Sequence, residues 1–192
     1  MNEILLIGGG GHCESAIDVI EQENRFKIVG IIDKPELLGK KILNYEIIGN
    51  DSDLEKLSKK YRYAIITVGQ IKSPSIRIKL FELAKQCGFS MPIIVSPRAY
   101  VSKYASIGHG TIVMHDALVN ANASVGVNCI INTKSLVEHG CSIGNNCHIS
   151  TASSINGGVK VEENCFIGSN ATVVEYLVVV ANSFIKAGSI IK

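Results

Sequence analysis

The chain has 192 residues, of which 46% are hydrophobic and 19% charged, so it can build a packed core and is not expected to be disordered. Its 19 basic and 17 acidic residues give a formal net charge of +2, with no basic arm or acidic tail, which argues against a nucleic-acid-binding protein. No apolar run is long enough to span a bilayer and the first residues do not form a secretory signal, so we expect a cytoplasmic protein.

Residues 1–94 alternate predicted strands with predicted helices. Strands are expected at Glu3–Ile7, Lys27–Ile32 and Tyr63–Val68, and helices at Glu14–Glu23, Asp51–Lys60 and Ser73–Gln86, the last capped by Gly88. Strands that alternate with helices favour a small parallel sheet. We therefore predict an α/β, Rossmann-like N-terminal domain.

A glycine-rich turn follows the first predicted strand, at Gly8-Gly9-Gly10-Gly11. Backbone N–H groups of such a turn, together with the start of a helix, suit a phosphate group. The dinucleotide fingerprint is incomplete, because Cys13 stands where its third glycine belongs, so hydride chemistry is disfavoured. Asp33 ends the second strand, where a carboxylate could accept from a ribose or a base. Nucleotide binding is favoured over a plain tight turn.

The second half contains a six-residue repeat. From Val95 an aliphatic residue recurs at every sixth position, and four residues later the position is nearly always small. The aliphatic series is Val95, Val101, Ile107, Val113, Val119, Val125, Ile131, Val137, Ile143, Ile149, Ile155, Val161, Ile167, Val173, Val179 and Ile185. A period of six contains three alternations of a strand, so each repeat is predicted to be a short strand and a corner, with one large and one small residue pointing inward.

The six cysteines fit no common zinc spacing, and without an export signal we expect free thiols. Cys129, Cys141, Cys147 and Cys165 occupy the small inward position of the repeat. Free cysteine packs like a small hydrophobic residue, so these four are predicted to lie in the core.

This pattern resembles the hexapeptide-repeat acyltransferases. The resemblance implies an all-β left-handed parallel β-helix with three repeats per coil over residues 95–192, and association into a homotrimer. Residues 18 apart then stack, so His139 is expected over Gly157 on one side and Ala121 on the other. Gly157 and Gly158 would leave a cleft with exposed backbone N–H groups beside a histidine base, as acyl transfer requires. His109 and His115 are interpreted as surface residues.

A narrower resemblance is to the NeuD/PglD-like sugar acetyltransferases. It is carried by Asn132–His139, Cys141, Ile143-Gly144 and His148-Ile149-Ser150, and by Gly8–Gly11 with His12, Asp33 and Thr67-Val68-Gly69. The resemblance implies His139 as the general base, and Asn132, His148, Gly157, Ser169 and Ala187 as the acetyl-CoA site, with the Gly157 amide on the acetyl oxygen. It implies Gly8, Gly10, Gly11, His12, Asp33 and Gly69 as the nucleotide-sugar site. It implies no metal, and active sites between neighbouring subunits.

The sequence departs from this group at two places. The group usually has Asp or Glu directly after the histidine base, and Gly140 stands there. Glu138 is the neighbouring carboxylate, but alternation along a strand predicts that it points away from His139. The group also continues into a closing Gly-x-Pro-Ala-Lys segment, before which this sequence ends at Lys192.

The leading hypothesis is an acetyl-CoA-dependent N-acetyltransferase acting on a nucleotide-linked 4-amino-4,6-dideoxy sugar in bacterial glycan biosynthesis, with UDP favoured as carrier. Direct transfer is expected, because no thiol is placed as a nucleophile. One alternative keeps the fold but acetylates a hydroxyl of a sialic-acid-type sugar. Another is a catalytically weak nucleotide-sugar-binding module, which the departure at Gly140 would favour.

Overall fold

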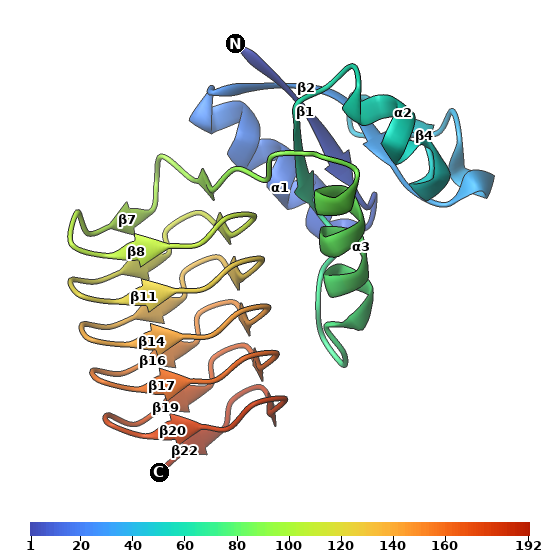
Figure 1. Cartoon of the computed structure of the whole chain (residues 1–192). Coiled ribbons are helices and arrows are strands. Elements are labelled where there is room, and N and C mark those ends of the chain that lie inside the picture. Colours follow the sequence, from blue (N-terminus) through green and yellow to red (C-terminus); the bar gives the residue numbers. More distant parts are fainter. The chain divides into compact units, whose positions relative to one another are not determined.

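The computed structural model covers residues 1–192 and divides into two compact units (Figure 1). The α/β unit comprises Met1–Gly69 and Ser75–Pro92, and the β-helix unit comprises Gln70–Pro74 and Ile93–Lys192. The short Gln70–Pro74 segment, which lies between two elements of the α/β unit in sequence, therefore belongs with the β-helix.

The α/β unit contains five strands and three α-helices. The strands are β1 (Asn2–Ile7), β2 (Phe26–Ile32), β3 (Lys41–Ile42), β4 (Tyr45–Gly49) and β5 (Tyr63–Ile66). The α-helices are α1 (Gly11–Glu23), α2 (Leu54–Ser58) and α3 (Ser75–Gln86), and single 3₁₀ turns occur at Pro35–Leu37 and Asp51–Asp53. The predicted Rossmann-like α/β fold is confirmed.

The sheet has the order β3-β4-β2-β1-β5, and every pairing is parallel except that of β3 with β4. The chain therefore leaves β1 toward β2 on one side and reaches β5 on the other, which makes the β1–β5 junction the topological switch point of the sheet. Helix α1 packs against β2, and α3 packs against β5. Ligands of open α/β sheets bind outside the carboxyl ends of the strands at such a point.

The hairpin of β3 and β4 was not among the predicted elements. Its first strand has only two residues, too few for an alternating pattern to be visible, and its turn places Leu43 at φ 51°. The helix predicted from Asp51 begins as a 3₁₀ turn, because Asn50 rather than Asp51 is its N-cap, in a capping box with Asp53.

The β-helix unit consists of two-residue strands that recur every six residues, and its coils stack from β7 to β22 (Figure 1). They are β6 (Ile94–Val95), β7 (Tyr100–Val101), β8 (Ser106–Ile107), β9 (Ile112–Val113), β10 (Leu118–Val119), β11 (Ser124–Val125), β12 (Ile130–Ile131), β13 (Leu136–Val137), β14 (Ser142–Ile143), β15 (His148–Ile149), β16 (Ser154–Ile155), β17 (Lys160–Val161), β18 (Phe166–Ile167), β19 (Thr172–Val173), β20 (Val178–Val179), β21 (Phe184–Ile185) and β22 (Ile190–Ile191).

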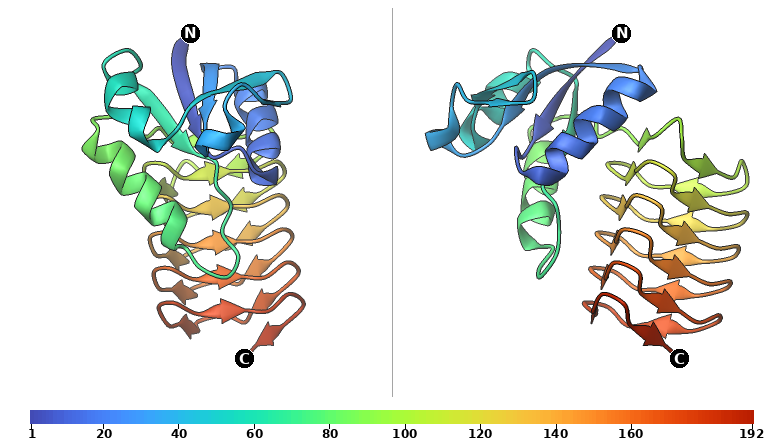
Figure 2. Two further views of the ribbon diagram at one scale, coloured as in Figure 1. Left: turned by 90° about the vertical axis from the view of Figure 1, so that its right-hand side faces the viewer. Right: turned by 180° about the vertical axis from the view of Figure 1, so that it is seen from behind.

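Every third strand pairs in parallel, which gives three sheets and a triangular coil of three repeats. We name the sheets by strands of the central coil: the β13 face, the β14 face and the β15 face. Partners are 18 residues apart throughout, as in the pairs of Val137 with Val119 and Ile155. The predicted all-β left-handed parallel β-helix is thus confirmed, and Figure 2 shows its coils from two further sides.

The corners between faces explain much of the remaining sequence. From Gly110 to Gly188 every sixth residue has a positive φ, between 55° and 70°. Asn and Gly fill most of these positions, because they reach the left-handed region at least cost. Gly140 is one of them, at φ 68°. Gly140, which stands where the family usually has Asp or Glu, therefore supplies the positive φ angle that this corner requires.

The predicted inward residues form the core of the β-helix. The aliphatic series is fully buried from Val113 through Val173. Cys129, Cys141, Cys147 and Cys165 are at most 1% exposed, which confirms their assignment to the core. Burial raises the pKa of the Cys141 thiol above its ordinary value.

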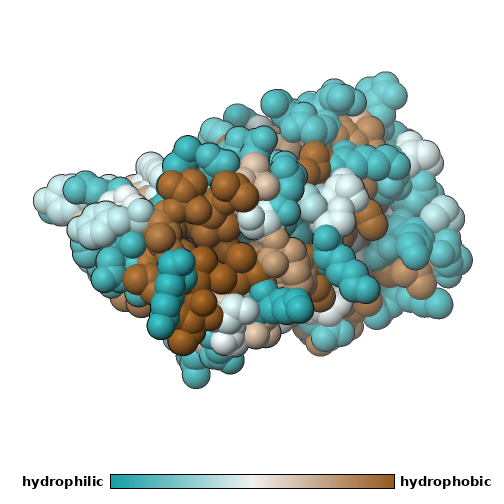
Figure 3. Space-filling model, turned by 90° about the horizontal axis from the view of Figure 1, so that it is seen from below, coloured by the Kyte–Doolittle hydropathy of each residue, from teal (hydrophilic) through white to brown (hydrophobic).

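Apolar side chains are exposed where the β-helix reaches its last coil, and they form the broad brown area in Figure 3. Those most exposed in the last coils are Tyr176, Val178, Val180, Phe184 and Ile190. Among the helices of the chain, none combines the length and the apolar character of a membrane span.

Candidate active site

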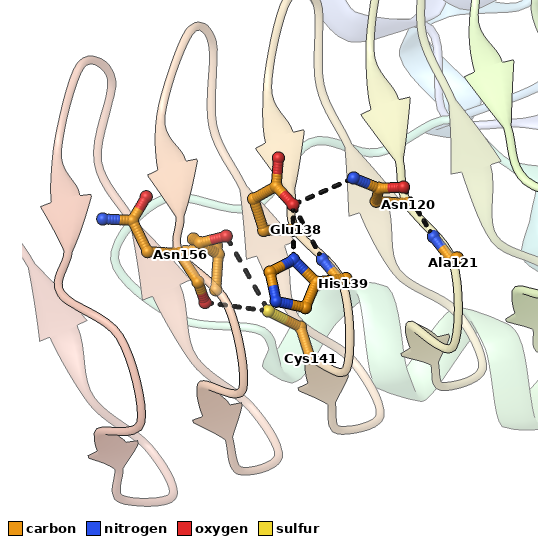
Figure 4. Close-up of polar contacts among 7 residues, drawn as sticks. Asn120, Ala121, Glu138, His139, Cys141 and Asn156 are labelled. Carbon is orange, nitrogen blue, oxygen red and sulfur yellow. Dashed lines mark hydrogen bonds and ion pairs between the residues drawn. The ribbon is translucent and has the colours of Figure 1, made fainter.

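His139 lies at the corner between the β13 and β14 faces, with its side chain 68% exposed. Its ring Nδ1 is 2.9 Å from Glu138 Oε2, and its backbone N–H donates to the same oxygen over 3.0 Å (Figure 4). A carboxylate only accepts hydrogen bonds, so the contact places the hydrogen of the neutral ring on Nδ1. Nε2 then carries the lone pair that a general base needs.

The expectation that Glu138 points away from His139 was wrong. Strand alternation ends with Val137, the inward residue of β13, and both Glu138 and His139 then point outward before Gly140 turns the corner. Glu138 Oε2 also accepts from Asn120 Nδ2 over 2.9 Å, and Asn120 is the residue stacked below it in the preceding coil. The carboxylate that orients His139 is thus supplied by the residue before the histidine.

Hydrogen bonds hold Glu138 in its charged form. The backbone N–H of His139 is the main cause that lowers the pKa of the Glu138 carboxyl, with further support from the His139 ring and Asn120. A permanent negative charge at Nδ1 would stabilise the imidazolium that forms when Nε2 takes up a proton.

Gly157 lies one coil beyond His139, as the 18-residue stacking predicts. A Cβ at Gly157 would lie 2.8 Å from His139 Cε1 and 2.9 Å from Nε2, so only glycine admits the ring in this position. The N–H of Gly158 donates to the carbonyl of His139 over 3.0 Å and is not free as expected, because the corner uses it to join two coils. The N–H of Gly157 makes no hydrogen bond within the chain.

A second group of predicted residues lies on the β15 face. His148, only 6% exposed, points Nδ1 at the backbone carbonyl of Gln70, and its Nε2 is 2.9 Å from Asn132 Nδ2. A carbonyl only accepts, so Nδ1 carries the hydrogen and Nε2 accepts from the Asn132 amide. Both ring nitrogens of His148 are therefore used inside the unit, and the ring ties Gln70 to Asn132.

A cavity of about 230 Å³ opens beside this group. Gln70–Pro74 forms one wall, and the rings of Phe166 and Phe184, stacked with centroids 5.0 Å apart, form another. Ser169 and Ala187 occupy the corner between the β15 and β13 faces, in successive coils, and the hydroxyl of Ser169 lies 3.0 Å from that of Ser150. The predicted acetyl-CoA residues other than Gly157 thus share one side of the β-helix.

Topology separates the two groups within one chain. His139 and Gly157 lie at the corner between the β13 and β14 faces, whereas His148 lies on the β15 face. In a coil of three faces, that corner is opposite the β15 face. A single chain cannot bring His139 and His148 into one site.

The predicted nucleotide residues lie at the switch point of the α/β unit. The turn after β1 is held by Asp33, whose Oδ2 accepts from the N–H of Gly9, while its Oδ1 accepts from the N–H of Lys34 over 2.7 Å. Thr67, which follows β5, donates its hydroxyl to the carbonyl of Gly8 over 2.6 Å. Gly8 has φ 109° and leaves no room for a side chain, because its Cβ would lie 2.9 Å from the Val68 nitrogen.

The start of α1 is open to a ligand. Gly10 is its N-cap and supplies no side-chain hydrogen bond, and a Cβ at Gly10 or Gly11 would meet no atom within 4 Å. The first N–H groups of a helix carry partial positive charge and suit an anion. Gly69 lies beside His12, since its Cβ would be 3.4 Å from that of His12. The six predicted nucleotide residues therefore surround one junction.

Arg77 was not predicted, yet it is a buried charge beneath this junction. It lies on α3, is 1% exposed, and donates from one guanidinium nitrogen to the carbonyls of Ile66 and Val68 over 2.8 and 2.9 Å. It thereby fixes the segment after β5 that carries Thr67 and Gly69. A lone arginine in an amphipathic helix gives no sequence signal for such a role, because exposed arginines have the same pattern.

Comparisons with known proteins agree with this arrangement. Residues 3–83 match the family described as the PglD N-terminal domain, and residues 140–175 match the bacterial transferase hexapeptide family with six repeats. No curated protein matches the chain by sequence.

Among solved structures, PerB from Caulobacter crescentus, in complex with CoA and GDP-perosamine, is 29% identical with a TM-score of 0.92, and the match covers 100% of this chain and 89% of PerB. The acetyltransferase domain of PglB from Neisseria gonorrhoeae is 27% identical with a TM-score of 0.89, and the match covers 100% and 92% of the two chains. WeeI from Acinetobacter baumannii, at 19% identity and a TM-score of 0.64, shares the fold.

Proposed function

We propose that this chain, an acyltransferase of the NeuD/PglD-like hexapeptide-repeat group, transfers an acetyl group from acetyl-CoA to the amino group of a nucleotide-linked sugar. The observation that carries the proposal is the His139 corner. A histidine oriented by Glu138 presents Nε2 beside Gly157, whose N–H has no partner within the chain. Acyl transfer needs a base that takes the proton of the nucleophile and an N–H donor that stabilises the developing oxyanion.

The residues have the following roles in this proposal. His139 Nε2 takes the proton from the sugar amine as the nitrogen attacks, and Glu138 stabilises the resulting imidazolium. The N–H of Gly157 donates to the carbonyl oxygen on which negative charge develops. Acetyl-CoA would supply the acetyl group as a thioester. The acyl C–S bond breaks once the C–N bond has formed, and the His139 imidazolium returns its proton to the departing thiolate, which gives an N-acetyl sugar and the free CoA thiol.

The fit of acetyl-CoA to this chain rests on two features. Gly157, whose N–H has no partner within the chain, lies beside the His139 ring, and the small residues Ser169 and Ala187 lie at the corner between the β15 and β13 faces. Because His148 lies on the face opposite the His139 corner, one active site joins His139 of one subunit with the β15 face of another. A homotrimer, the usual assembly of hexapeptide-repeat proteins, satisfies this requirement with three sites.

The acceptor in this proposal is a nucleotide-linked 4-amino-4,6-dideoxy sugar, whose nucleotide binds at the glycine-rich turn after β1. PerB, which is similar over the whole of this chain, was crystallised with GDP-perosamine, and this supports an amino sugar on a nucleoside diphosphate. We keep UDP as the proposed carrier and GDP as its competitor. Acetylation of a sugar hydroxyl is the second candidate, because the geometry at Nε2 serves an amine or a hydroxyl equally.

The test is release of the free CoA thiol from acetyl-CoA with UDP-, GDP- and dTDP-linked 4-amino sugars and with a free sialic-acid-type sugar. We expect release with one nucleotide-linked amino sugar and a loss of kcat of about 10²–10⁴ in His139→Ala. Because the His139 side chain is largely exposed, the variant should unfold at the wild-type temperature. The matched control is His109→Ala, at another corner of the β-helix, which should keep the wild-type rate.

Release with the sialic-acid-type sugar alone would replace the amine by a hydroxyl as the acceptor group. Release that survives in His139→Ala would place the base elsewhere. Binding of acetyl-CoA with no release on any acceptor would favour the binding-module hypothesis.

A further inference from the structure

Tyr176 has a backbone conformation that its residue type disfavours. It fills the positive-φ position of its corner, at φ 59°, where Asn or Gly stands in most repeats. A bulky side chain in the left-handed region is strained, and such strain clusters where structure serves a ligand. Tyr176 is also 79% exposed as a residue, so burial in the chain's own core does not compensate for the strain.

The position of the ring links Tyr176 to the candidate active site. A Cβ at Gly158 would lie 2.5 Å from Tyr176 Cδ1 and 2.7 Å from Cε1, so one edge of the phenol ring packs against Gly158. The His139 ring lies on the adjacent Gly157 from the preceding coil. Gly157 and Gly158 thus form one corner that lies between two rings: the imidazole of His139 from the preceding coil and the phenol of Tyr176 from the following coil.

Tyr176 is on the same coil as Ser169, which is part of the proposed donor site, and two coils beyond His139. In the proposed function the thioester end of the donor lies at Gly157 of one subunit, and its arm runs along the β-helix axis toward the later coils, to which Ser169 and Ala187 of the neighbouring subunit belong. An arm that leaves Gly157 in this direction passes the level of Tyr176. Resting on that proposed function, we infer that the Tyr176 ring is a binding wall for the pantetheine arm of acetyl-CoA and sets the affinity for the donor.

The physical basis is the flat, rigid ring. An aromatic side chain offers a large apolar contact area with few rotatable bonds, so little conformational entropy is lost on binding. Asn at this position would relieve the backbone strain but remove the wall. A tyrosine at this position therefore increases the affinity for acetyl-CoA at the cost of backbone strain in its own corner.

The experiment compares Tyr176→Asn with Tyr176→Phe in the full chain. CoA binding is measured by calorimetry, and KM is measured separately for acetyl-CoA and for the sugar acceptor. We expect Tyr176→Asn to raise the Kd for CoA and the KM for acetyl-CoA about threefold to tenfold, with the KM for the sugar unchanged. Tyr176→Phe keeps the ring and should bind CoA like the wild type.

The same variants separate binding from stability. Tyr176→Asn should melt at or a few degrees above the wild-type temperature, because Asn tolerates positive φ. Leu43→Asn is the matched control, since Leu43 is an exposed apolar residue at φ 51° in the α/β unit, and it should leave every kinetic constant unchanged.

Unchanged donor constants in Tyr176→Asn would overturn the inference, as would a rise in the sugar KM alone or a change in oligomeric state by sedimentation. If the wild type binds CoA and Tyr176→Asn binds it equally well, only this inference fails. If the wild type does not bind CoA, both the proposed function and this inference fail.

Discussion

The β-helix and the α/β unit differ in how far apart in sequence the contacting residues are, and in how often each contact is repeated. In the β-helix every strand pairs with the strand 18 residues away, and the same corner recurs every six residues. In the α/β unit, β1 pairs with β2 and β5 across intervals of different length, and each contact occurs once. Repetition spreads stability over many equivalent contacts, whereas the α/β unit depends on single ones.

This difference also shows where to look for function. In a repeated structure the candidate functional residues are those that break the repeat, and in the proposed function these are the Gly157–Gly158 pair and His139 at a corner. In the α/β unit nothing repeats, so the candidate residues come from the switch point of the sheet and from buried charges such as Arg77.

The largest effect is expected at Arg77. Arg77→Met should reduce the free energy of unfolding by about 3 kcal/mol, because the carbonyls of Ile66 and Val68 lose their charged donor. The measurement is urea denaturation followed by circular dichroism. Arg98→Met is the matched control in the β-helix, where the exposed Arg98 pairs with Asp116, and it should cost at most about 0.5 kcal/mol. Equal losses in the two variants would mean that the buried contacts of Arg77 contribute no more than an exposed ion pair.

A smaller effect is expected at Glu138, which breaks the repeat by orienting His139. Glu138→Gln should lower kcat about tenfold with little change in either KM, because the charge that stabilises the imidazolium is removed while the shape is kept. The fold of the variant is checked by its melting temperature. An unchanged kcat would mean that the contact between Glu138 and His139 Nδ1 has no catalytic role.

The same pair has a pH signature with a fixed sign. The folded-state pKa of Glu138 lies below its ordinary value, so the carboxylate stabilises the fold above the ordinary pKa of glutamic acid. This contribution is lost as the pH falls through the lowered folded-state pKa. The stability difference between wild type and Glu138→Gln should therefore be constant near neutral pH and shrink in acid.

The smallest effect is expected within the repeat itself. Asn146 belongs to a ladder of side-chain amides, accepting from Asn128 over 2.9 Å and donating to Asn164 over 3.2 Å. Asn146→Gly keeps the positive φ and removes only the ladder contacts, so it should cost about 1 kcal/mol of unfolding free energy. Asn146→Ala adds backbone strain and should cost more. A loss as large as that of Arg77→Met would show that the repeat does not share its stability among coils.

Much of the site could be predicted from the sequence, because the 18-residue spacing fixes which residues stack. It placed His139 against Gly157 and assigned the four core cysteines correctly. The partner of His139 could not be predicted in the same way. The rule of strand alternation was extended past Val137 into a corner, where it does not apply, and this led to the wrong orientation for Glu138.

The sequence by itself determined the period, and with it the strands, the inward residues and the β-helix. Six residues contain three alternations of a strand, so the same positions point inward in every repeat and bury their side chains when the coils stack. It also determined the alternating elements of the α/β unit and its glycine-rich turn. Only the tertiary structure decided which side chains meet at the corners and the switch point. Those contacts depend on how side chains point where strand alternation ends at a corner, as at Glu138 and His139, and on a buried guanidinium, and neither leaves a local pattern in the chain.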